Sequence, residues 1–149
     1  MSNIKILVVE DDDVIRTELA RLAIGFGRVE EASSVQEAMR MLSETPYELV
    51  FVDLGLSDGS GFELIEAANR NPTPPMLIVV SSTLSIVDRN RALAMGARDF
   101  ISKPFFAAEV EMRIRRVMET RVLKTDETKK RDESSHSNHR KKRQLFGLI

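Results

Sequence analysis

Carboxylates follow two apolar segments of this sequence at the point where each segment ends. Glu10 and Asp11 open an acidic run after Ile4–Val9, and Asp53 follows Leu49–Val52. Short apolar runs rich in β-branched residues are typical of strands buried on both faces of a parallel sheet. If these two strands are neighbours, their carboxyl ends meet at one edge, so the three carboxylates are expected to converge.

Three carboxylates that lie close together repel one another unless protons or a cation neutralise their charge. Mg2+ is the expected partner, because this hard ion prefers oxygen ligands, takes few carboxylates and keeps several waters. A solvated acidic turn explains such a run equally well when the run stands alone. We keep that interpretation for Asp12 and Asp13, which we predict to be helix N-caps.

A hydroxyl group and an ammonium group are expected at the same edge of the sheet. Ser81 follows the apolar segment Met76–Val80, and Lys103 comes shortly after the weaker strand candidate Asp99–Ile101. Beside a carboxylate–metal cluster these groups suit a phosphoryl ligand, since a lysine supplies a point charge and a serine a hydrogen bond to its oxygens. Each residue alone is ordinary, and only their joint spacing indicates a site.

Helical patterns separate the five predicted strands, of which Val29–Ala32 is the second. Ser34 with Glu37 and Ser85 with Asp88 form capping-box signatures before two of the helices. Apolar residues at helical spacing mark the other three helices. These residues are Ile15, Leu19, Leu22 and Phe26; Phe62, Ile65 and Ala68; and Val110, Ile114, Val117 and Met118.

The alternation of strands and helices predicts an α/β fold with a parallel sheet, right-handed crossovers and helices on both faces. Five such units match the flavodoxin-like doubly wound (βα)5 fold. In that fold the five-stranded parallel sheet has the order 2-1-3-4-5, and ligands bind at the switch point between strands 1 and 3. We therefore predict one domain over residues 1–123 and a separate tail over residues 124–149.

The sequence closely resembles the receiver domain of two-component response regulators, of the chemotaxis-regulator type, from residue 3 to about residue 122. The matching motifs are ILVVEDD at 6–12 with Arg16 after it, DLGLSDGSG at 53–61, VVSS at 79–82, Gly96-Ala97, and FISKPF at 100–105. Each motif alone is weak evidence, but all of them in this order and at this spacing are specific to the family.

The resemblance implies a metal site and a phosphoacceptor. Glu10 and Asp11 are expected to hold Mg2+, Glu10 through water. Asp53 is expected to be the phosphoacceptor and also a metal ligand, and the backbone carbonyl of Gly55 completes the protein ligands.

The resemblance also implies catalytic and switch residues. Lys103 is expected to contact the phosphoryl group, and the Lys103–Pro104 bond to be cis, which costs little before proline. Ser81 stands at the switch hydroxyl position, Phe100 at the aromatic switch position, and Ser82 at a small-residue position beside the phosphoryl group. Without the resemblance, Phe100 would simply be a core aromatic residue.

Three positions carry further expectations about this chain. Family members often have proline where this chain has Ser57, so we expect the loop after Asp53 to be looser. Glu10 in place of aspartate is a common family variant. Gly55 is small and leaves a path for water, which favours moderate or fast self-dephosphorylation.

These residues support a phosphoacceptor response regulator. Asp53 would take a phosphoryl group in line from a sensor histidine kinase or a phosphotransfer protein, with catalysis by positioning and electrostatics. Such a chain acts only on itself and is not an enzyme in the ordinary sense. No effector domain follows, so we expect a stand-alone regulator. It would signal to a downstream protein or a second copy through the face formed by helix 4, strand 5 and helix 5.

Charge is unevenly distributed along the chain. Residues 1–123 hold 14 basic and 19 acidic residues, a net charge of −5, whereas residues 124–149 hold 8 and 4, a net charge of +4. The acidic body argues against direct DNA binding. The absence of cysteine excludes disulfides and thiolate metal sites. With no bilayer-spanning apolar run and no signal peptide, we expect a cytoplasmic location.

The tail differs in composition from the rest of the chain. Residues 124–143 lack apolar side chains, so we predict disorder. Arg140–Arg143, followed by an apolar tip at 145–149, would suit an acidic partner or an anionic membrane surface; the alternative is a solvated tail without a target. We interpret His136 and His139 as tail residues rather than metal ligands, because no other ligand accompanies them.

Three other functions fit part of the pattern. Aspartate-nucleophile phosphatases of the haloacid-dehalogenase type also use Mg2+, but they carry two aspartates two residues apart after the first strand, and here Gly55 stands two residues after Asp53. A receiver-like scaffold without phosphorylation would not need the full set of site residues. A flavin- or nucleotide-binding relative would have a glycine-rich phosphate loop after strand 1, which this sequence lacks.

Overall fold

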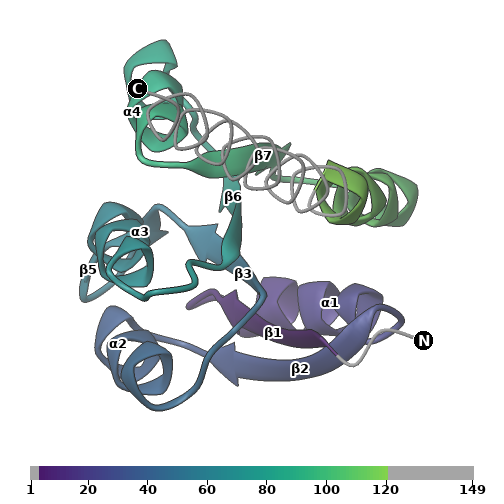
Figure 1. The fold of residues 1–149 in the computed structure, drawn as a ribbon. Coiled ribbons are helices and arrows are strands. Elements are labelled where there is room, and N and C mark those ends of the chain that lie inside the picture. Colours follow the sequence, from purple (N-terminus) through teal and green to yellow (C-terminus); the bar gives the residue numbers. More distant parts are fainter. Residues whose placement is uncertain (1–3, 121–149) are drawn as a thin grey trace, which may run out of the picture. The chain divides into compact units, whose positions relative to one another are not determined.

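The structure is a computed structural model, and it describes residues 4–120 (Figure 1). The chain divides into two compact units, Met1–Ile114 and Arg115–Ile149. In the second unit the described residues are 115–120, which are helical. The predicted tail over residues 124–149, with its histidines and its basic segment, lies outside the described residues.

Strands and helices alternate along the first unit. The strands are β1 (Ile4–Val9), β2 (Gly27–Ala32), β3 (Leu49–Asp53), β4 (Gly55–Leu56), β5 (Gly59–Ser60), β6 (Met76–Ser81) and β7 (Ala97–Ser102). The helices are α1 (Asp13–Ala23), α2 (Val35–Glu44), α3 (Gly61–Asn69) and α4 (Ile86–Ala94). A fifth helix begins at residue 107.

The five long strands form one parallel sheet in the order β2-β1-β3-β6-β7. Apart from the short antiparallel hairpin of β4 and β5, this is the predicted order 2-1-3-4-5. The predicted flavodoxin-like α/β fold is therefore confirmed. The direction of winding reverses between β1 and β3, so the carboxyl ends of these two strands flank the crevice where such folds bind ligands.

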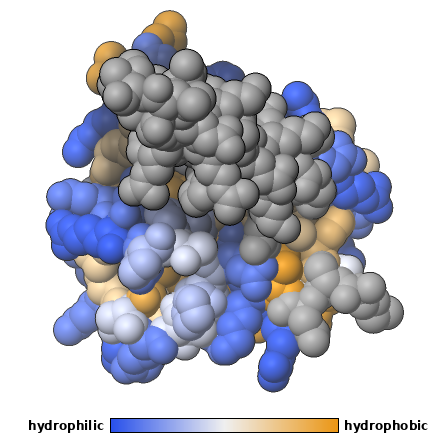
Figure 2. All heavy atoms as spheres, in the orientation of Figure 1, coloured by the Kyte–Doolittle hydropathy of each residue, from blue (hydrophilic) through white to orange (hydrophobic). Residues whose placement is uncertain are grey.

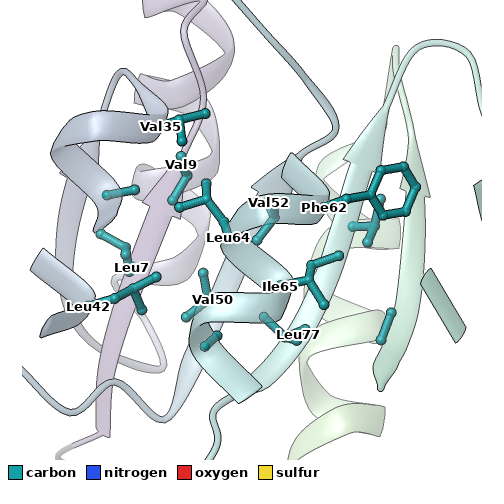
Figure 3. Close-up of a cluster of buried hydrophobic side chains, with 14 of the residues drawn as sticks. Leu7, Val9, Val35, Leu42, Val50, Val52, Phe62, Leu64, Ile65 and Leu77 are labelled. Carbon is teal, nitrogen blue, oxygen red and sulfur yellow. The ribbon is translucent and has the colours of Figure 1, made fainter. Parts of the chain in front are cut away.

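The central strands are buried on both faces, as their unbroken apolar runs predict. Every residue of β3 and β6 is buried. Val50 and Val52 of β3 belong to a cluster with Leu42 of α2 and Ile65 of α3 (Figure 3). Phe51 between them is fully buried too, and α1 lies on the opposite side of the sheet from α2 and α3 (Figure 1). This packing fixes the strand ends that carry the polar residues of the site.

Side-chain caps begin the helices where the sequence predicts them. The amide of Glu37 donates to Ser34 Oγ over 3.1 Å, and the amide of Asp88 donates to Ser85 Oγ over 3.1 Å. The carboxylate of Glu37 does not return to the amide of Ser34, as a capping box requires. It accepts instead from the amide of Ser33, over 3.1 Å. Both predicted N-caps are thus confirmed, and at α2 the reciprocal bond is shifted by one residue.

The acidic run after β1 divides between two structural roles. Asp12 is the N-cap of α1, as predicted, and its Oδ1 accepts from the amide of Ile15 over 3.0 Å. The same prediction for Asp13 was wrong. Asp13 is the first residue of α1, where the positive end of the helix dipole stabilises its carboxylate. The same carboxylate pairs with Arg16 over 2.5 Å.

The surface shown in Figure 2 carries mostly hydrophilic side chains, with apolar side chains in smaller patches among them. Ile86 and Val87 of α4 are 78% and 75% exposed, and Phe106 is 82% exposed. None of the helices within residues 4–120 combines the length and the apolar character that a membrane crossing requires.

Candidate functional site

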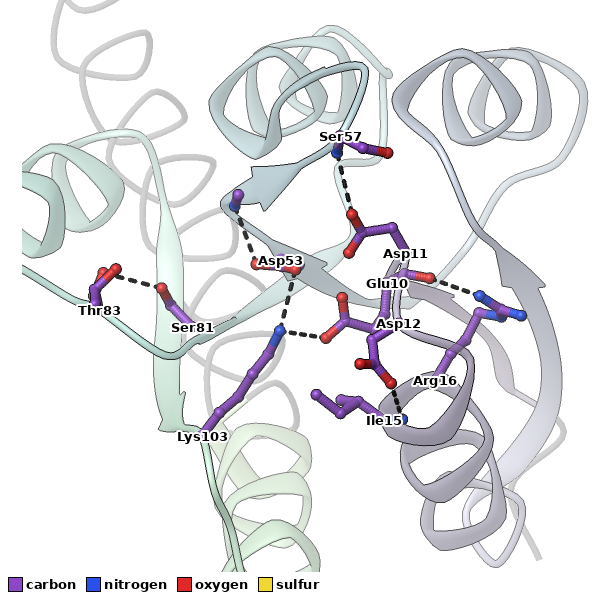
Figure 4. Close-up of polar contacts among 11 residues, drawn as sticks. Glu10, Asp11, Asp12, Ile15, Arg16, Asp53, Ser57, Ser81, Thr83 and Lys103 are labelled. Atoms are coloured by element: carbon purple, nitrogen blue, oxygen red, sulfur yellow. Dashed lines mark hydrogen bonds and ion pairs between the residues drawn. The ribbon is translucent and has the colours of Figure 1, made fainter.

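Four strand ends bring their polar residues to one edge of the sheet (Figure 4). Glu10 follows β1, Asp53 ends β3, Ser81 ends β6, and Lys103 follows β7. Two backbone hydrogen bonds fix these ends. The amide of Glu10 donates to the carbonyl of Ala32 over 3.0 Å, and the amide of Lys103 donates to the carbonyl of Ser81 over 2.9 Å. The convergence predicted from the sequence is present in the fold.

The predicted metal-binding carboxylates form a cluster. One carboxylate oxygen from each of Glu10, Asp11 and Asp53 lies within 4.8 Å of the others. Glu10 and Asp53 are buried, 1% and 5% exposed, whereas Asp11 is half-buried. The guanidinium of Arg16 donates to the carbonyl of Glu10 over 2.9 Å and so fixes the backbone at this turn. Two of the three acidic groups, Glu10 and Asp53, are therefore largely removed from bulk water.

Lys103 is the cation of this cluster. Its ammonium lies 3.1 Å from Asp53 Oδ2 and also forms an ion pair with Glu10 (Figure 4). The side chain of Lys103 is only 13% exposed, so these ion pairs are shielded from solvent. One lysine charge does not neutralise three carboxylates, and the site retains a net negative charge when all of them are ionised.

Burial and neighbouring charges shift the pKa values of Glu10 and Asp53 in opposite directions. Burial raises the pKa of Glu10 to about 7, with a further increase from the adjacent Asp53 and an opposing effect of Lys103. Burial also acts to raise the pKa of Asp53. Glu10, the amide of Gly55 and Lys103 outweigh it, so the pKa of Asp53 lies below its usual value. Of the two buried carboxyl groups, Asp53 is therefore the more acidic.

The residues present fit a divalent cation. Glu10 Oε1 is paired with the ammonium of Lys103, whereas Glu10 Oε2 is buried and has no hydrogen-bond partner among residues 4–120, an arrangement that is unfavourable unless a cation or a water supplies one. Two or three carboxylates form an all-oxygen donor set of the kind that hard cations such as Mg2+ and Ca2+ bind, with waters as further ligands. The cluster can hold a hard divalent metal ion.

The backbone after Asp53 completes the site. The amide of Gly55 donates to Asp53 Oδ1 over 3.0 Å, so each oxygen of this carboxylate has a donor, Lys103 being the other. Gly61 approaches Asp53 so closely that an added Cβ would lie 2.3 Å from the Asp53 carbonyl oxygen. The first residue of α3 must therefore be glycine for β3 to end where it does.

The predicted switch residues lie on the β6 and β7 side of the cluster. The hydroxyl of Ser81 is buried and donates to the carbonyl of Thr83 over 3.0 Å (Figure 4). Phe100 of β7 is 8% exposed, and the guanidinium carbon of Arg89 lies 5.0 Å from its ring centroid. The Lys103–Pro104 peptide bond is cis, as expected.

A cleft of about 960 Å³ opens over the cluster. Its lining includes Asp11, Asp53, Ser81 and Lys103, together with Phe62 and Arg91. The guanidinium carbon of Arg91 lies 4.1 Å from the centroid of the Phe62 ring, which is a cation–π contact between α4 and α3. Sequence reasoning missed Arg91, because a single arginine in an amphipathic helix has no local pattern that separates it from a solvated one.

The loop that follows Asp53 is held by contacts that the sequence did not predict. β4 and β5 form a hairpin, the amide of Ser57 donates to Asp11 Oδ2 over 3.2 Å, and Asp58 accepts from two amides of α2. None of these contacts joins residues close in sequence, apart from the hairpin itself. The expectation that Ser57 in place of proline makes the loop looser stays a prediction.

The family model of the response regulator receiver domain matches residues 6–115. The KDP operon transcriptional regulatory protein KdpE of Escherichia coli (strain K12) is 37% identical over 111 residues, which cover 74% of this chain and 49% of that protein. The chain thus spans about half the length of the curated relatives that it matches.

Solved structures resemble the fold closely. A CheY-like response regulator receiver domain protein from Methanospirillum hungatei matches with a TM-score of 0.74 and 25% identity, over 82% of this chain and 99% of that one. A response regulator protein from Burkholderia pseudomallei, with a phosphorylated aspartic acid, calcium ion and citrate, matches with a TM-score of 0.65 and 27% identity, over 72% of this chain and 64% of that one. The family match over most of the described sheet and cleft agrees with these likenesses. The chain belongs to the response regulator receiver domain family.

Proposed function

We propose that Asp53 accepts a phosphoryl group from a phosphohistidine of a sensor histidine kinase or a phosphotransfer protein. One observation carries the proposal: the buried carboxylate of Asp53 lies in an open cleft, 3.1 Å from the ammonium of Lys103 and within 4.8 Å of two further acidic side chains. The related Burkholderia pseudomallei protein contains a phosphorylated aspartic acid. Its likeness supports the same modification here.

The proposed transfer is a displacement at the phosphorus atom of the phosphohistidine. An Asp53 oxygen forms the new P–O bond, the P–N bond to the donor imidazole breaks, and its electron pair remains on the leaving nitrogen. Lys103 neutralises charge on a phosphoryl oxygen, so the protein contributes mainly position and electrostatics. The proposed reaction is self-modification, and later attack of water on the acyl phosphate returns Asp53 to its starting state. Gly55 has no side chain, which leaves a path for that water to reach the acyl phosphate.

The acidic cluster is proposed to hold Mg2+. Glu10, Asp11, Asp53 and the backbone carbonyl of Gly55 are its proposed ligands, with Glu10 acting through water. The ion, when bound, supplies positive charge beside the phosphoryl oxygens. The unpartnered Oε2 of Glu10 supports this assignment, as does the calcium ion in the related Burkholderia pseudomallei structure.

The response to phosphorylation is proposed to run through Ser81 and Phe100. The Ser81 hydroxyl, released from the carbonyl of Thr83, would donate to a phosphoryl oxygen, and Phe100 would turn into the vacated space. Ser82 leaves room for the phosphoryl group. A phosphoryl group adds roughly −1.5 to −2 charges and new acceptor oxygens, which is enough to favour a new hydrogen-bond arrangement.

The output is proposed to be a protein contact on the face formed by α4, β7 and the helix that begins at residue 107. Ile86 and Val87 expose apolar surface there, which suits a downstream protein or a second copy. The net charge of −5 over residues 1–123 underlies our proposal that this part does not bind DNA directly. We also propose that the chain is cytoplasmic. The basic tail, residues 124–149, is proposed to contact an acidic partner or a membrane surface.

The decisive experiment is labelling of the chain by a small phosphodonor, such as a phosphoramidate, with Mg2+. Wild type and Asp13→Asn should both gain a phosphoryl group in intact-mass spectra, and Asp53→Asn should not. Equal labelling of Asp53→Asn would refute the assignment of Asp53. An unlabelled wild type would favour a receiver-like scaffold, and steady multiple turnover of phosphate esters would favour a phosphatase.

A further inference from the structure

The loop between β3 and α3 is fastened to the start of α2. Asp58, at the turn of the β4–β5 hairpin, accepts from the amide of Val35 over 2.8 Å and from the amide of Gln36 over 3.1 Å. Amides in the first turn of a helix have no partner within the helix, so the carboxylate satisfies two of them. The hairpin turn is therefore anchored to a helix far from it in sequence.

The residue next to this anchor donates to the acidic cluster. The amide of Ser57 donates to Asp11 Oδ2 over 3.2 Å (Figure 4). Among residues 4–120, no other hydrogen bond reaches the Asp11 carboxylate. One oxygen of Asp11 is thus held by the loop, and the other oxygen is left for a further partner.

We propose that the Ser57 backbone amide, held in place by Asp58 on α2, orients Asp11 as a ligand of the divalent cation. This inference rests on the proposed metal site and adds a positioning residue to it. A neutral amide fixes the carboxylate without cancelling its charge, so Asp11 remains an anionic ligand. Orientation before binding means that less side-chain freedom is lost when the cation arrives.

The chain offers a matched pair of substitutions at Ser57. Ser57→Ala keeps the backbone amide, whereas Ser57→Pro removes it. The local backbone is compatible with proline, because the preceding Leu56 is in a strand and no residue other than glycine has a positive φ in the described part of the chain. Proline is also a favoured residue at the first central position of a turn.

The test is calorimetric titration of the full chain with Mg2+ alone. Wild type and Ser57→Ala should bind with the same Kd, and Ser57→Pro should bind about threefold to tenfold more weakly, the effect of one hydrogen bond. Thermal unfolding of the metal-free proteins should show Ser57→Pro to be less stable than Ser57→Ala by no more than the one lost hydrogen bond, because the stiffer unfolded chain offsets part of that loss. A general structural defect would lower the stability by more than this.

A second pair tests the anchor and covers the case that Ser57→Pro does not fold. Asp58→Ala releases the hairpin turn and should weaken Mg2+ binding. Ser34→Ala removes another cap of the same helix, the bond to the Glu37 amide, and should leave Mg2+ binding unchanged. Equal losses of affinity in both variants would mean that α2 stability alone matters, which overturns the inference.

The outcomes separate this inference from the proposed function. If the wild-type chain binds no Mg2+, the proposed metal site fails, and the inference fails with it. If wild type and Ser57→Ala bind Mg2+ and a folded Ser57→Pro binds it equally well, the metal site stands and only the positioning role is overturned.

Discussion

The ammonium of Lys103 lies 3.1 Å from Oδ2 of Asp53, a residue 50 positions earlier in the chain. The two residues belong to opposite sides of β6 in the sheet, and both reach the same cleft. The contact requires β3, β6 and β7 to end level with one another, which the parallel register provides. Chemistry at Asp53 therefore depends on the alignment of the whole sheet edge.

Replacement of Lys103 by methionine should destabilise the metal-free chain by roughly 1–3 kcal/mol, since the variant leaves buried carboxylates without their cation. Urea unfolding in the presence of a chelator measures this loss. Saturating Mg2+ should reduce it, because the ion replaces the missing positive charge. A variant whose deficit is the same with and without Mg2+ would show that packing of the lysine stem, rather than its charge, is what matters.

Mg2+ should stabilise the wild-type chain by about 2.7 kcal/mol at a free concentration of 100 times its Kd, because only the folded state assembles the cluster. Asp11→Asn removes a ligand and should need more Mg2+ for the same rise in melting temperature. Asp13→Asn, which changes an exposed carboxylate of α1, should respond like wild type. A similar loss of response in both variants would argue for diffuse charge attraction instead of a site.

Gly61→Ala should destabilise the chain by roughly 1–3 kcal/mol through steric overlap. The added Cβ would meet the Asp53 carbonyl oxygen at 2.3 Å, so β3 must shift where it ends. Gly25→Ala is the control, because its nearest neighbour would be 4.0 Å away. Urea unfolding of the two variants measures the difference, and labelling of Gly61→Ala by a phosphodonor should also be slower. Equal stability of the two variants contradicts the expectation.

The contribution of Asp58 to stability should depend on pH. Hydrogen bonds from the amides of Val35 and Gln36 lower the pKa of Asp58 in the folded chain. A carboxyl group with a lowered folded pKa stabilises the fold above its unfolded pKa, and this stabilisation is lost as the pH falls through the folded pKa. The stability difference between wild type and Asp58→Asn should thus be largest near neutral pH and shrink below about pH 4. A difference that stays constant with pH would assign the effect to hydrogen-bond geometry alone.

Local sequence patterns predicted the sheet well, because its strands are buried on both faces and leave unbroken apolar runs. Leu49–Val52 and Met76–Val80 became the central strands β3 and β6, each extended by one polar residue of the site, Asp53 and Ser81. The same rule placed those polar residues at the strand ends. Topology then brought the strand ends together.

Contacts between distant segments were not predictable in the same way. The bonds from Ser57 to Asp11 and from α2 to Asp58 span 46 and up to 23 positions, and neither leaves a periodic signal. A serine in a proline position indicated a change in the loop, but not which contacts the loop makes. Ser57 has a backbone N–H that proline lacks, and its acceptor, Asp11, is known only from the folded structure.

Helix α4 buries one small side chain, Ala92, and also meets its neighbours through Arg89 over Phe100 and Arg91 over Phe62, while Ile86 and Val87 are exposed to solvent. An element with so little buried apolar area can tilt or partly unwind at a small free-energy cost. Under the switch that we propose for Ser81, such a helix would let a change at one hydroxyl group alter a large part of the surface while the sheet stays in place.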